Sequence, residues 1–119
     1  MSRRPVDPVV ARSTFDALRR PSGRARKGAL QVSFSPIVSP AGKPQAAFAV
    51  SKRCGGAVDR NLIRRRLRAA LRETQIKLIP GAYLIRTDPE VLELSFQELI
   101  HSLEDCLERA GEKGRINGN

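Results

Sequence analysis

The stretch FAVSKRCGGAVDRNLIRRRLRAALRE, residues 48–73, decides the fold because the chain changes from strand to helix within it. Before Gly55, larger side chains alternate with small ones, which predicts a strand over about residues 45–53. Gly55 and Gly56 end that strand. A helix is predicted from about residue 57 to about residue 77, where mainly apolar residues recur on one helix face. That face carries Ile63, Leu67, Ala70, Leu71 and Thr74.

Two further strands flank this stretch. Leu30, Val32 and Phe34 alternate with polar residues, the pattern of a half-buried strand. Residues 82–87, AYLIRT, form another short strand after the break at Pro80 and Gly81. Residues 39–44, SPAGKP, form a turn by composition.

Two helices are predicted near the ends of the chain. Ser13 is the expected N-cap of a short first helix that ends before Pro21. Residues 95–110 repeat apolar side chains every three or four positions, so they predict a last helix with an acidic outer face. Gly111 is its expected end. Helices that alternate with a few strands indicate an α+β sandwich.

The totals describe one small domain, residues 1–119, with flexible ends at 1–11 and 112–119. No apolar run approaches the ~20 residues needed to span a bilayer. No signal peptide is recognisable either, so we expect a cytoplasmic protein without a membrane partner. Cys54 and Cys106 are the only cysteines, and their spacing indicates two free thiols and no zinc site.

The charge distribution indicates a polyanionic partner. The net charge is +10, and Asp59 is the only acidic residue between positions 52 and 72. The cations of that stretch are Lys52, Arg53, Arg60, Arg64, Arg65, Arg66, Arg68 and Arg72. Residues 88–119 carry more acidic than basic residues, so the basic surface is localised.

The arginines of residues 60–72 admit two interpretations. They form a solvated face, or they hold an anion that removes their mutual repulsion. Like charges four residues apart weaken a helix, and a stable surface helix normally intersperses Glu. Arginine can grip phosphate with two hydrogen bonds, which favours the anion. Gly55 and Gly56 either permit close approach of a phosphate or serve as a simple turn.

No catalytic group of a protein nuclease is recognisable. His101 is the only histidine, and it lies in the last predicted helix as a surface or structural residue. The carboxylates cluster on that helix without a pairing suited to two-metal hydrolysis. An autonomous metal-dependent nuclease is therefore disfavoured, and neither a catalytic residue nor a protein-bound metal is predicted.

Residues 48–73 resemble the signature of the bacterial ribonuclease P protein component: a strand that ends in V-S-K-R, a glycine turn, A-V-x-R-N and then spaced basic residues. Ala57, Val58, Arg60 and Asn61 match the most specific part. Residues 13–20, STFDALRR, resemble the opening helix of the family, although Arg19 stands where many members have a second Phe.

The resemblance implies a ribosomal-protein-like two-layer sandwich, in the order helix, three strands, helix, strand, helix. It also implies a left-handed β-α-β crossover, against the usual right-handed rule. A third strand before the long helix is then expected near residues 24–27. The implied function is to assist a catalytic RNA that removes the 5′ leader of precursor tRNA with Mg²⁺. The partners would be that RNA and precursor tRNA.

The same resemblance implies two RNA surfaces. The catalytic RNA would contact Lys52, Arg53, Arg60, Asn61, Arg64, Arg65, Arg68 and Arg72. The leader would lie in a cleft that contains Phe15, Ala49 and Ser51. Phe15 either stacks a leader base or anchors its helix in the core, and Ala49 and Ser51 either admit the leader or pack under a helix. A ribosomal or ribosome-associated protein is the alternative function, since composition alone does not separate the two.

Overall fold

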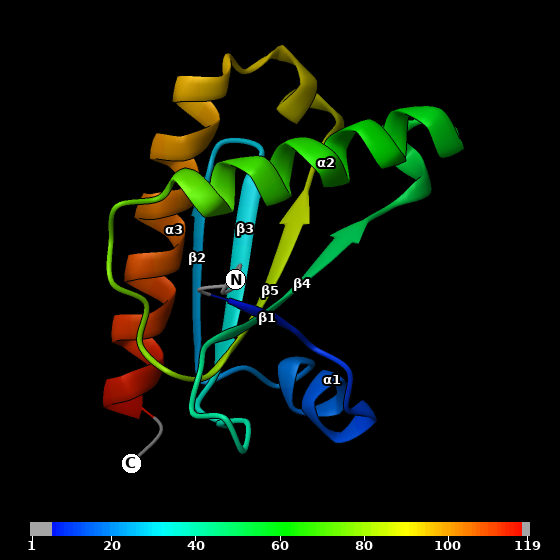
Figure 1. The fold of residues 1–119 in the computed structure, drawn as a ribbon. Coiled ribbons are helices and arrows are strands. Elements are labelled where there is room, and N and C mark those ends of the chain that lie inside the picture. Colours follow the sequence, from blue (N-terminus) through cyan, green and yellow to red (C-terminus); the bar gives the residue numbers. More distant parts are fainter. Residues whose placement is uncertain (1–5, 118–119) are drawn as a thin grey trace, which may run out of the picture.

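The computed structural model describes residues 6–117 as one five-stranded sheet with three helices (Figure 1). Short 3₁₀ turns at Lys52–Cys54 and Pro89–Glu93 follow the strands Gln45–Val50 and Ala82–Thr87. The elements in chain order are β1 (Asp7–Pro8), α1 (Arg12–Leu18), β2 (Gly23–Lys27), β3 (Leu30–Ser35), β4 (Gln45–Val50), α2 (Ala57–Glu73), β5 (Ala82–Thr87) and α3 (Phe96–Asn117).

The sheet has the order β1-β4-β5-β3-β2, and α2 connects the parallel neighbours β4 and β5. Strand β3 pairs antiparallel with both β5 and β2. Together with the helices, this is the predicted α+β sandwich, and β2 is the third strand expected near residues 24–27. The left-handed sense of the crossover stays a prediction.

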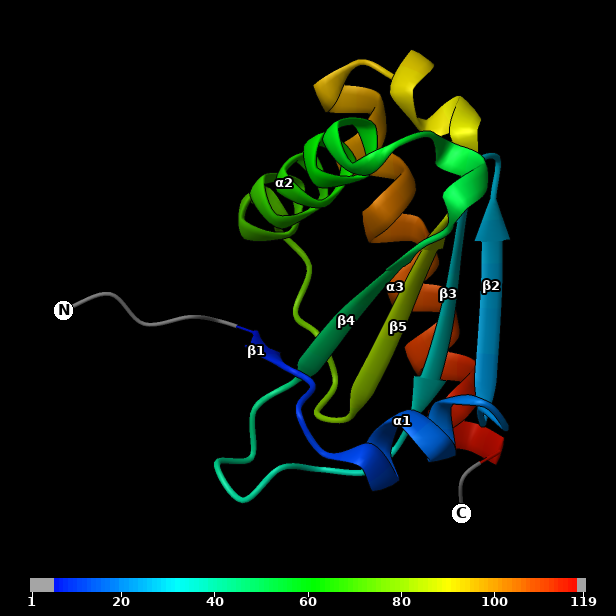
Figure 2. The ribbon, with the colours of Figure 1, turned by 90° about the vertical axis from the view of Figure 1, so that its right-hand side faces the viewer.

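One main core lies between the sheet and helices α2 and α3. Alternate strand residues such as Val32, Phe34 and Ile85 meet the apolar stripes of both helices. Figure 2 shows that α1 lies apart from them, at the lower end of the sheet, where Leu18 packs with Val9 and Ala82. Helix α1 lies on the second face of the sheet, opposite to α2 and α3. The upper part of this second face has no helix over it among residues 6–117, and we call it the open face.

Helix α2 ends at Glu73, so the predicted extension to residue 77 is wrong. Thr74 has an extended backbone, and its hydroxyl donates to the carbonyl of Leu71 at 2.8 Å. The chain then leaves the helix axis so that Ile76 and Leu78 pack against the core. Burial of these two side chains outweighs continuation of the helix, which the local pattern alone did not reveal.

Helix α3 runs through Gly111, which was expected to end it, and includes residues 112–117, which were expected to be flexible. Close packing favours glycine at positions 111 and 114 of this helix. A Cβ on Gly111 would lie 3.1 Å from the Tyr83 hydroxyl, and one on Gly114 would collide with the ring of Phe34. The small residues therefore let α3 approach the sheet closely instead of stopping it.

The amino-terminal segment also differs from expectation. Asp7–Pro8 pairs with β4 and Val9 is buried, so this part of the expected flexible end is ordered in the sheet; residues 1–5 lie outside the described residues. Helix α1 begins at Arg12, and Ser13 lies inside its first turn rather than at the N-cap. The carbonyl of Ala11 accepts the first helical hydrogen bonds, so the N-cap is Ala11 and the helix starts two residues earlier than expected.

Cys54 and Cys106 are free, as predicted, and both are buried. Burial raises the pKa of the Cys106 thiol. Among residues 6–117 no helix combines the length and apolar character that a membrane crossing requires.

Candidate nucleic-acid interface

Helix α2 buries the stripe that the sequence predicts and leaves its arginines outside it. Ile63, Leu67 and Ala70 are at most 1% exposed. Arg60, Arg64 and Arg68 follow each other at intervals of one turn beside this stripe, and Arg65 and Arg72 extend the basic surface around the helix. We call Arg60, Asn61, Arg64, Arg65, Arg68 and Arg72 the arginine surface.

No carboxylate of residues 6–117 forms an ion pair with the arginine surface. None of the ion pairs found among residues 6–117 involves a residue of α2. The carboxylates of α3 have partners elsewhere. Asp105 accepts from Arg109, which lowers the pKa of the carboxyl, and Glu112 pairs with Arg115. Glu104 accepts the backbone N–H of Gln75 at 2.7 Å. The self-repulsion predicted from the sequence therefore persists in the folded chain.

Two guanidinium groups of the arginine surface, those of Arg64 and Arg68, are held by short-range contacts that leave donors free. Arg64 Nη1 donates to Asn61 Oδ1 at 3.1 Å. The guanidinium carbon of Arg68 lies 6.0 Å from the centre of the Phe48 ring, at the outer limit of a cation–π contact. Arg60 Nε is buried and has no hydrogen-bond partner within the described part of the chain. These contacts orient the guanidinium groups without using up their positive charge.

Arg66 differs from its neighbours. Its Nη2 donates to the carbonyl of Leu94 at 2.8 Å, so it ties α2 to the segment before α3. A guanidinium that binds the protein in this way is a structural contact, which makes Arg66 a useful reference for the arginine surface.

The glycine pair before α2 acts as a turn. Gly55 has φ of 121°, and a Cβ there would meet the side chain of Asp59. The Asp59 carboxylate already brings negative charge to this end of the helix. The geometry thus favours the turn over the phosphate site that the sequence left open. Lys52 and Arg53 lie exposed in the 3₁₀ turn just before it.

The open face is basic because of strand alternation and register. Strand pairing places Ala49, Arg86, Gln31 and Arg26 in one row across four strands. The next row toward α1 contains Ala47, Leu84, Ser33 and Arg24. The small residues Ala47 and Ala49 lie on β4, directly beside Leu84 and Arg86 of β5, and the other two arginines lie on the edge strand β2.

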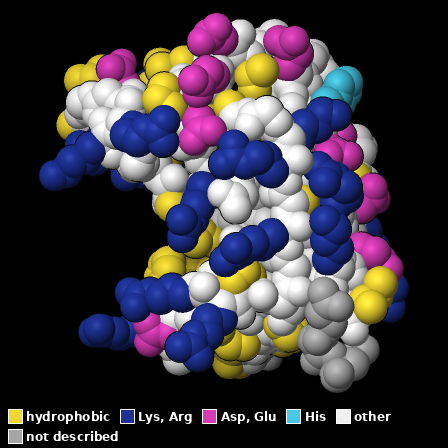
Figure 3. Space-filling model, turned by 180° about the vertical axis from the view of Figure 1, so that it is seen from behind, with side chains coloured by type: hydrophobic (Ala, Val, Ile, Leu, Met, Phe, Trp, Pro, Cys, Tyr) yellow, Lys and Arg dark blue, Asp and Glu magenta, His cyan; other side chains and the backbone are white. Residues whose placement is uncertain are grey.

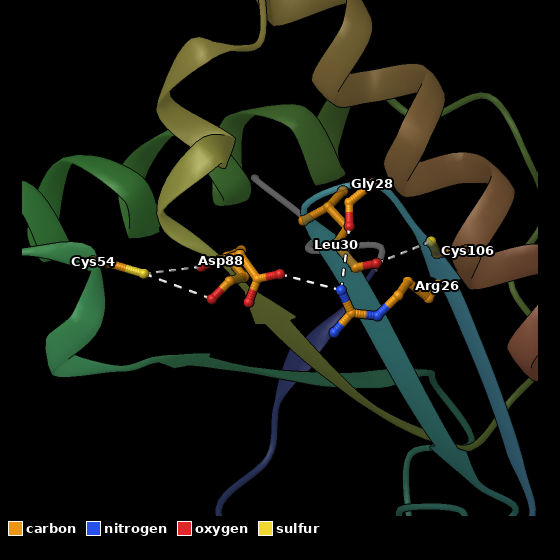
Figure 4. A network of polar contacts seen from close by, with 7 residues as sticks. Arg26, Gly28, Leu30, Cys54, Asp88 and Cys106 are labelled. Atoms are coloured by element: carbon orange, nitrogen blue, oxygen red, sulfur yellow. Dashed lines mark hydrogen bonds and ion pairs between the residues drawn. The ribbon is translucent and has the colours of Figure 1, made fainter.

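A hollow of about 450 Å³ lies at the upper end of this face, and we call it the upper hollow. It brings together Ala49, Ser51 and Arg53, three of the predicted site residues. It adds residues that the sequence analysis missed: Arg26, Gln31, Arg86 and Asp88. Figure 4 shows that Arg26 reaches from β2 toward Asp88, with 3.1 Å between Nη1 and Oδ2. Alternation within GRARK and AYLIRT was the signal that could have placed Arg26 and Arg86 on this face.

Phe15 lies on α1 and is not part of the upper hollow. It is 40% exposed, whereas Thr14 and Leu18 on the same helix are buried. The interpretation of Phe15 as a core anchor is therefore wrong, and its ring is exposed on α1.

Figure 3 shows the molecule from the side opposite to that in Figure 1. Its left edge is hollowed, and Lys and Arg side chains surround this hollow and cross the middle of the face. Most Asp and Glu side chains gather along the top and right of the view, toward α3. No group of three or more His, Cys, Asp or Glu side chains is placed to hold a metal within residues 6–117. His101 is an exposed residue of α3.

Fold and surface together define a small basic α+β sandwich with two cationic surfaces for a polyanion, one on α2 and one on the open face. The model of the Ribonuclease P family matches residues 7–111. The ribonuclease P protein component of Thermobifida fusca is 36% identical over 110 residues, which are 87% of this chain and 75% of that protein. The corresponding protein of Nocardioides is 35% identical over 83% of this chain and 86% of its own. The chain belongs to the ribonuclease P protein component family.

Other relatives match over shorter stretches, and solved structures confirm the fold. The Roseiflexus protein of strain RS-1 is 39% identical, but the match spans 57% of its length. The ribonuclease P protein of Thermotoga maritima has a TM-score of 0.71 at 17% identity and covers 87% of this chain and 96% of its own. That of Staphylococcus aureus has a TM-score of 0.68 at 17% identity, over 89% and 94% of the two chains. Membership of this family implies an RNA partner.

Proposed function

We propose that this chain is the protein subunit of a ribonucleoprotein endoribonuclease that removes the 5′ leader of precursor tRNA. In this proposal the arginine surface binds the catalytic RNA, and the open face binds the leader. The RNA subunit performs the cleavage with Mg²⁺, and the protein contributes binding. The observation that carries the proposal is the row of guanidinium groups on α2 that no carboxylate of the described chain neutralises.

The charge of the arginine surface suits a folded RNA for a physical reason. Cations that contact phosphates release condensed counterions, and this release drives binding at moderate salt. The same neutralisation lets two RNAs approach with fewer free metal ions. We therefore expect the protein to lower the Mg²⁺ concentration at which the RNA subunit cleaves its substrate.

The open face suits a single strand. Ala47, Ala49 and Ser33 leave room for bases near the sheet, while Arg26 and Arg86 offer donors to the backbone phosphates. The ion pair between Arg26 and Asp88 is partly exposed. It therefore orients the guanidinium of Arg26 but costs little free energy to break. An incoming phosphate can then replace the carboxylate.

The proposed function is tested by cleavage of precursor tRNA at low Mg²⁺ with the protein alone, the RNA subunit alone and both together. We expect cleavage only from the combination at Mg²⁺ concentrations where the RNA alone is slow. Cleavage by the purified protein alone would instead indicate an autonomous nuclease. Absence of stimulation, with binding to ribosomes, would favour the ribosome-associated alternative.

Phe15→Ala is expected to weaken binding of precursor tRNA by roughly 1–3 kcal/mol, the range for loss of one base stacked on an aromatic ring. Binding of mature tRNA, which has no leader, should not change. The measurement is the affinity of the reconstituted complex for both RNAs.

Phe96→Ala is the matched control, since Phe96 is 38% exposed and begins α3 at the opposite end of the molecule. It should leave both affinities unchanged. An equal loss for precursor and mature tRNA in Phe15→Ala would remove the stacking role.

A further inference from the structure

A second basic hollow lies at the lower end of β2, where α1, β2 and the last turns of α3 meet. Its volume is about 530 Å³, and we call it the lower hollow. Four cations line it together with Pro21, Ser22 and Gly23, and no carboxylate does. The four cations are Arg19, Arg20, Arg24 and Lys113. None of them is among the residues that the sequence analysis assigned to RNA.

The wall of the lower hollow is fixed by close packing of α3 on β2. A Cβ on Gly23 would collide with the backbone of α3 at Ala110 and Gly114, so the two backbones touch there. Lys113 Nζ donates to the carbonyl of Arg24 at 3.3 Å. One turn earlier, Arg109 donates to the carbonyl of Arg26 at 2.8 Å. The ammonium group of Lys113 is thereby held at the edge of the sheet rather than free in solvent.

The positive charge of the lower hollow is poorly compensated. The carboxylate of Asp16 lies 4.0 Å from Arg19, and both side chains are largely exposed, so this pair contributes little. Arg109, in contrast, is neutralised by Asp105. Lys113 has a carbonyl as its partner and therefore keeps its full charge.

The two hollows are joined along β2. Arg24 lines the lower hollow and Arg26 the upper one, and both side chains point to the open face because they are two residues apart on a strand. Their Cα atoms are then about 7 Å apart. A row of cations that continues from one hollow into the other fits a linear polyanion better than a single small anion.

We propose that the lower hollow, together with the side of β2 that carries Arg24 and Arg26, binds backbone phosphates of the leader. These phosphates belong to the part of the leader that lies farthest from the cleavage site. This inference rests on the proposed function. The arginine surface, which would face the catalytic RNA, lies at the upper end of the sheet, so nucleotides near the cleavage site occupy the upper hollow. Nucleotides farther toward the 5′ end then reach Arg24, Arg20 and Lys113.

The test uses the variant Arg20→Ala/Arg24→Ala in the complex reconstituted with the RNA subunit. Affinity is measured for precursor tRNAs whose leaders are lengthened one nucleotide at a time. For the longest leaders, we expect loss of two phosphate contacts to lower the slope of log affinity against log salt by about 1.4 and the affinity at ~0.1 M salt by about 25-fold. The shortest leaders should bind as they do to the wild type.

Lys27→Ala/Lys77→Ala is the matched control, because both lysines are exposed and neither lines a hollow. It removes the same charge and should leave the dependence on leader length unchanged. Equal losses in the two variants would mean that net charge alone matters and would overturn the proposal. So would weaker assembly of Arg20→Ala/Arg24→Ala with the RNA subunit at unchanged leader dependence.

Binding of single-stranded oligouridylate to the protein alone separates this inference from the proposed function. If no complex that cleaves precursor tRNA forms at all, the proposed function is wrong. Oligouridylate binding to the protein alone then tests whether the lower hollow binds phosphates. A reduced salt slope for Arg20→Ala/Arg24→Ala then still supports the phosphate site, and an unchanged slope overturns it.

Discussion

Replacement of Arg64 and Arg68 by alanine is expected to lower the affinity for the catalytic RNA by roughly 25- to 60-fold at ~0.1 M salt. The slope of log affinity against log salt should fall by about 1.4 to 1.8, the contribution of two phosphate contacts. Both side chains lie on the arginine surface, and neither is paired with a carboxylate among residues 6–117. In the proposed complex, the change thus removes charge that the RNA would neutralise.

The double variant should fold as well as the wild type. Loss of the Arg68 contact with Phe48 removes about 0.5–1 kcal/mol. Relief of the repulsion between arginines one turn apart stabilises the helix by a few tenths of a kcal/mol. The higher helix propensity of alanine stabilises it by a few tenths of a kcal/mol as well. The free energy of unfolding is then expected to stay within about 1 kcal/mol of the wild type.

Arg66→Ala is the control on the same helix. Its guanidinium binds the carbonyl of Leu94, so its loss should affect stability more than the salt slope. If Arg66→Ala and the double variant lowered the slope equally per arginine removed, binding would follow net charge and not the arginine surface.

Gly23→Ala is expected to destabilise the fold by about 3 kcal/mol or more, at or above the top of the usual range for overpacking. The new Cβ would collide with the carbonyl oxygen of Ala110 and the backbone nitrogen of Gly114. A backbone cannot move aside as a flexible side chain can, so α3 must shift away from β2 along its length. Unfolding by denaturant measures the loss.

Gly56→Ala provides the comparison, since a Cβ at Gly56 meets nothing within 4 Å and its φ of −76° suits any residue. Its free energy of unfolding should lie within about 1 kcal/mol of the wild type. Equal stability of the Gly23 and Gly56 variants would contradict the close packing of α3 on β2, and with it the wall of the lower hollow.

Short-range patterns predicted most of the fold because strands and helices bury one face each. The stripe of α2 and the alternation of β3 and β4 needed no tertiary information. Apart from the start of α1, the errors occur where distant contacts decide. Helix α2 ends early, and Ile76 and Leu78 then pack against the core. Gly111 lies inside α3 instead of ending it, because the Tyr83 hydroxyl leaves little room for a side chain at that position. Strand β2 was expected only through the family resemblance.

The arginine surface could be predicted from sequence, since one helix carries all its members. The open face could not be predicted as fully. Its basic rows depend on the register that places Arg26 beside Gln31 and Arg86 on the strand beyond. The lower hollow was harder still, because Lys113 reaches Arg24 only through the close packing of α3 on β2.

The claim on which the account depends is that α2 faces RNA. Ultraviolet crosslinking of the protein to RNA in cells, followed by identification of the linked RNA and peptide, tests it most directly. We expect one long structured RNA attached to peptides from residues 57–73. Crosslinks that fall on α3 instead, or a capture dominated by ribosomal RNA, would contradict the account.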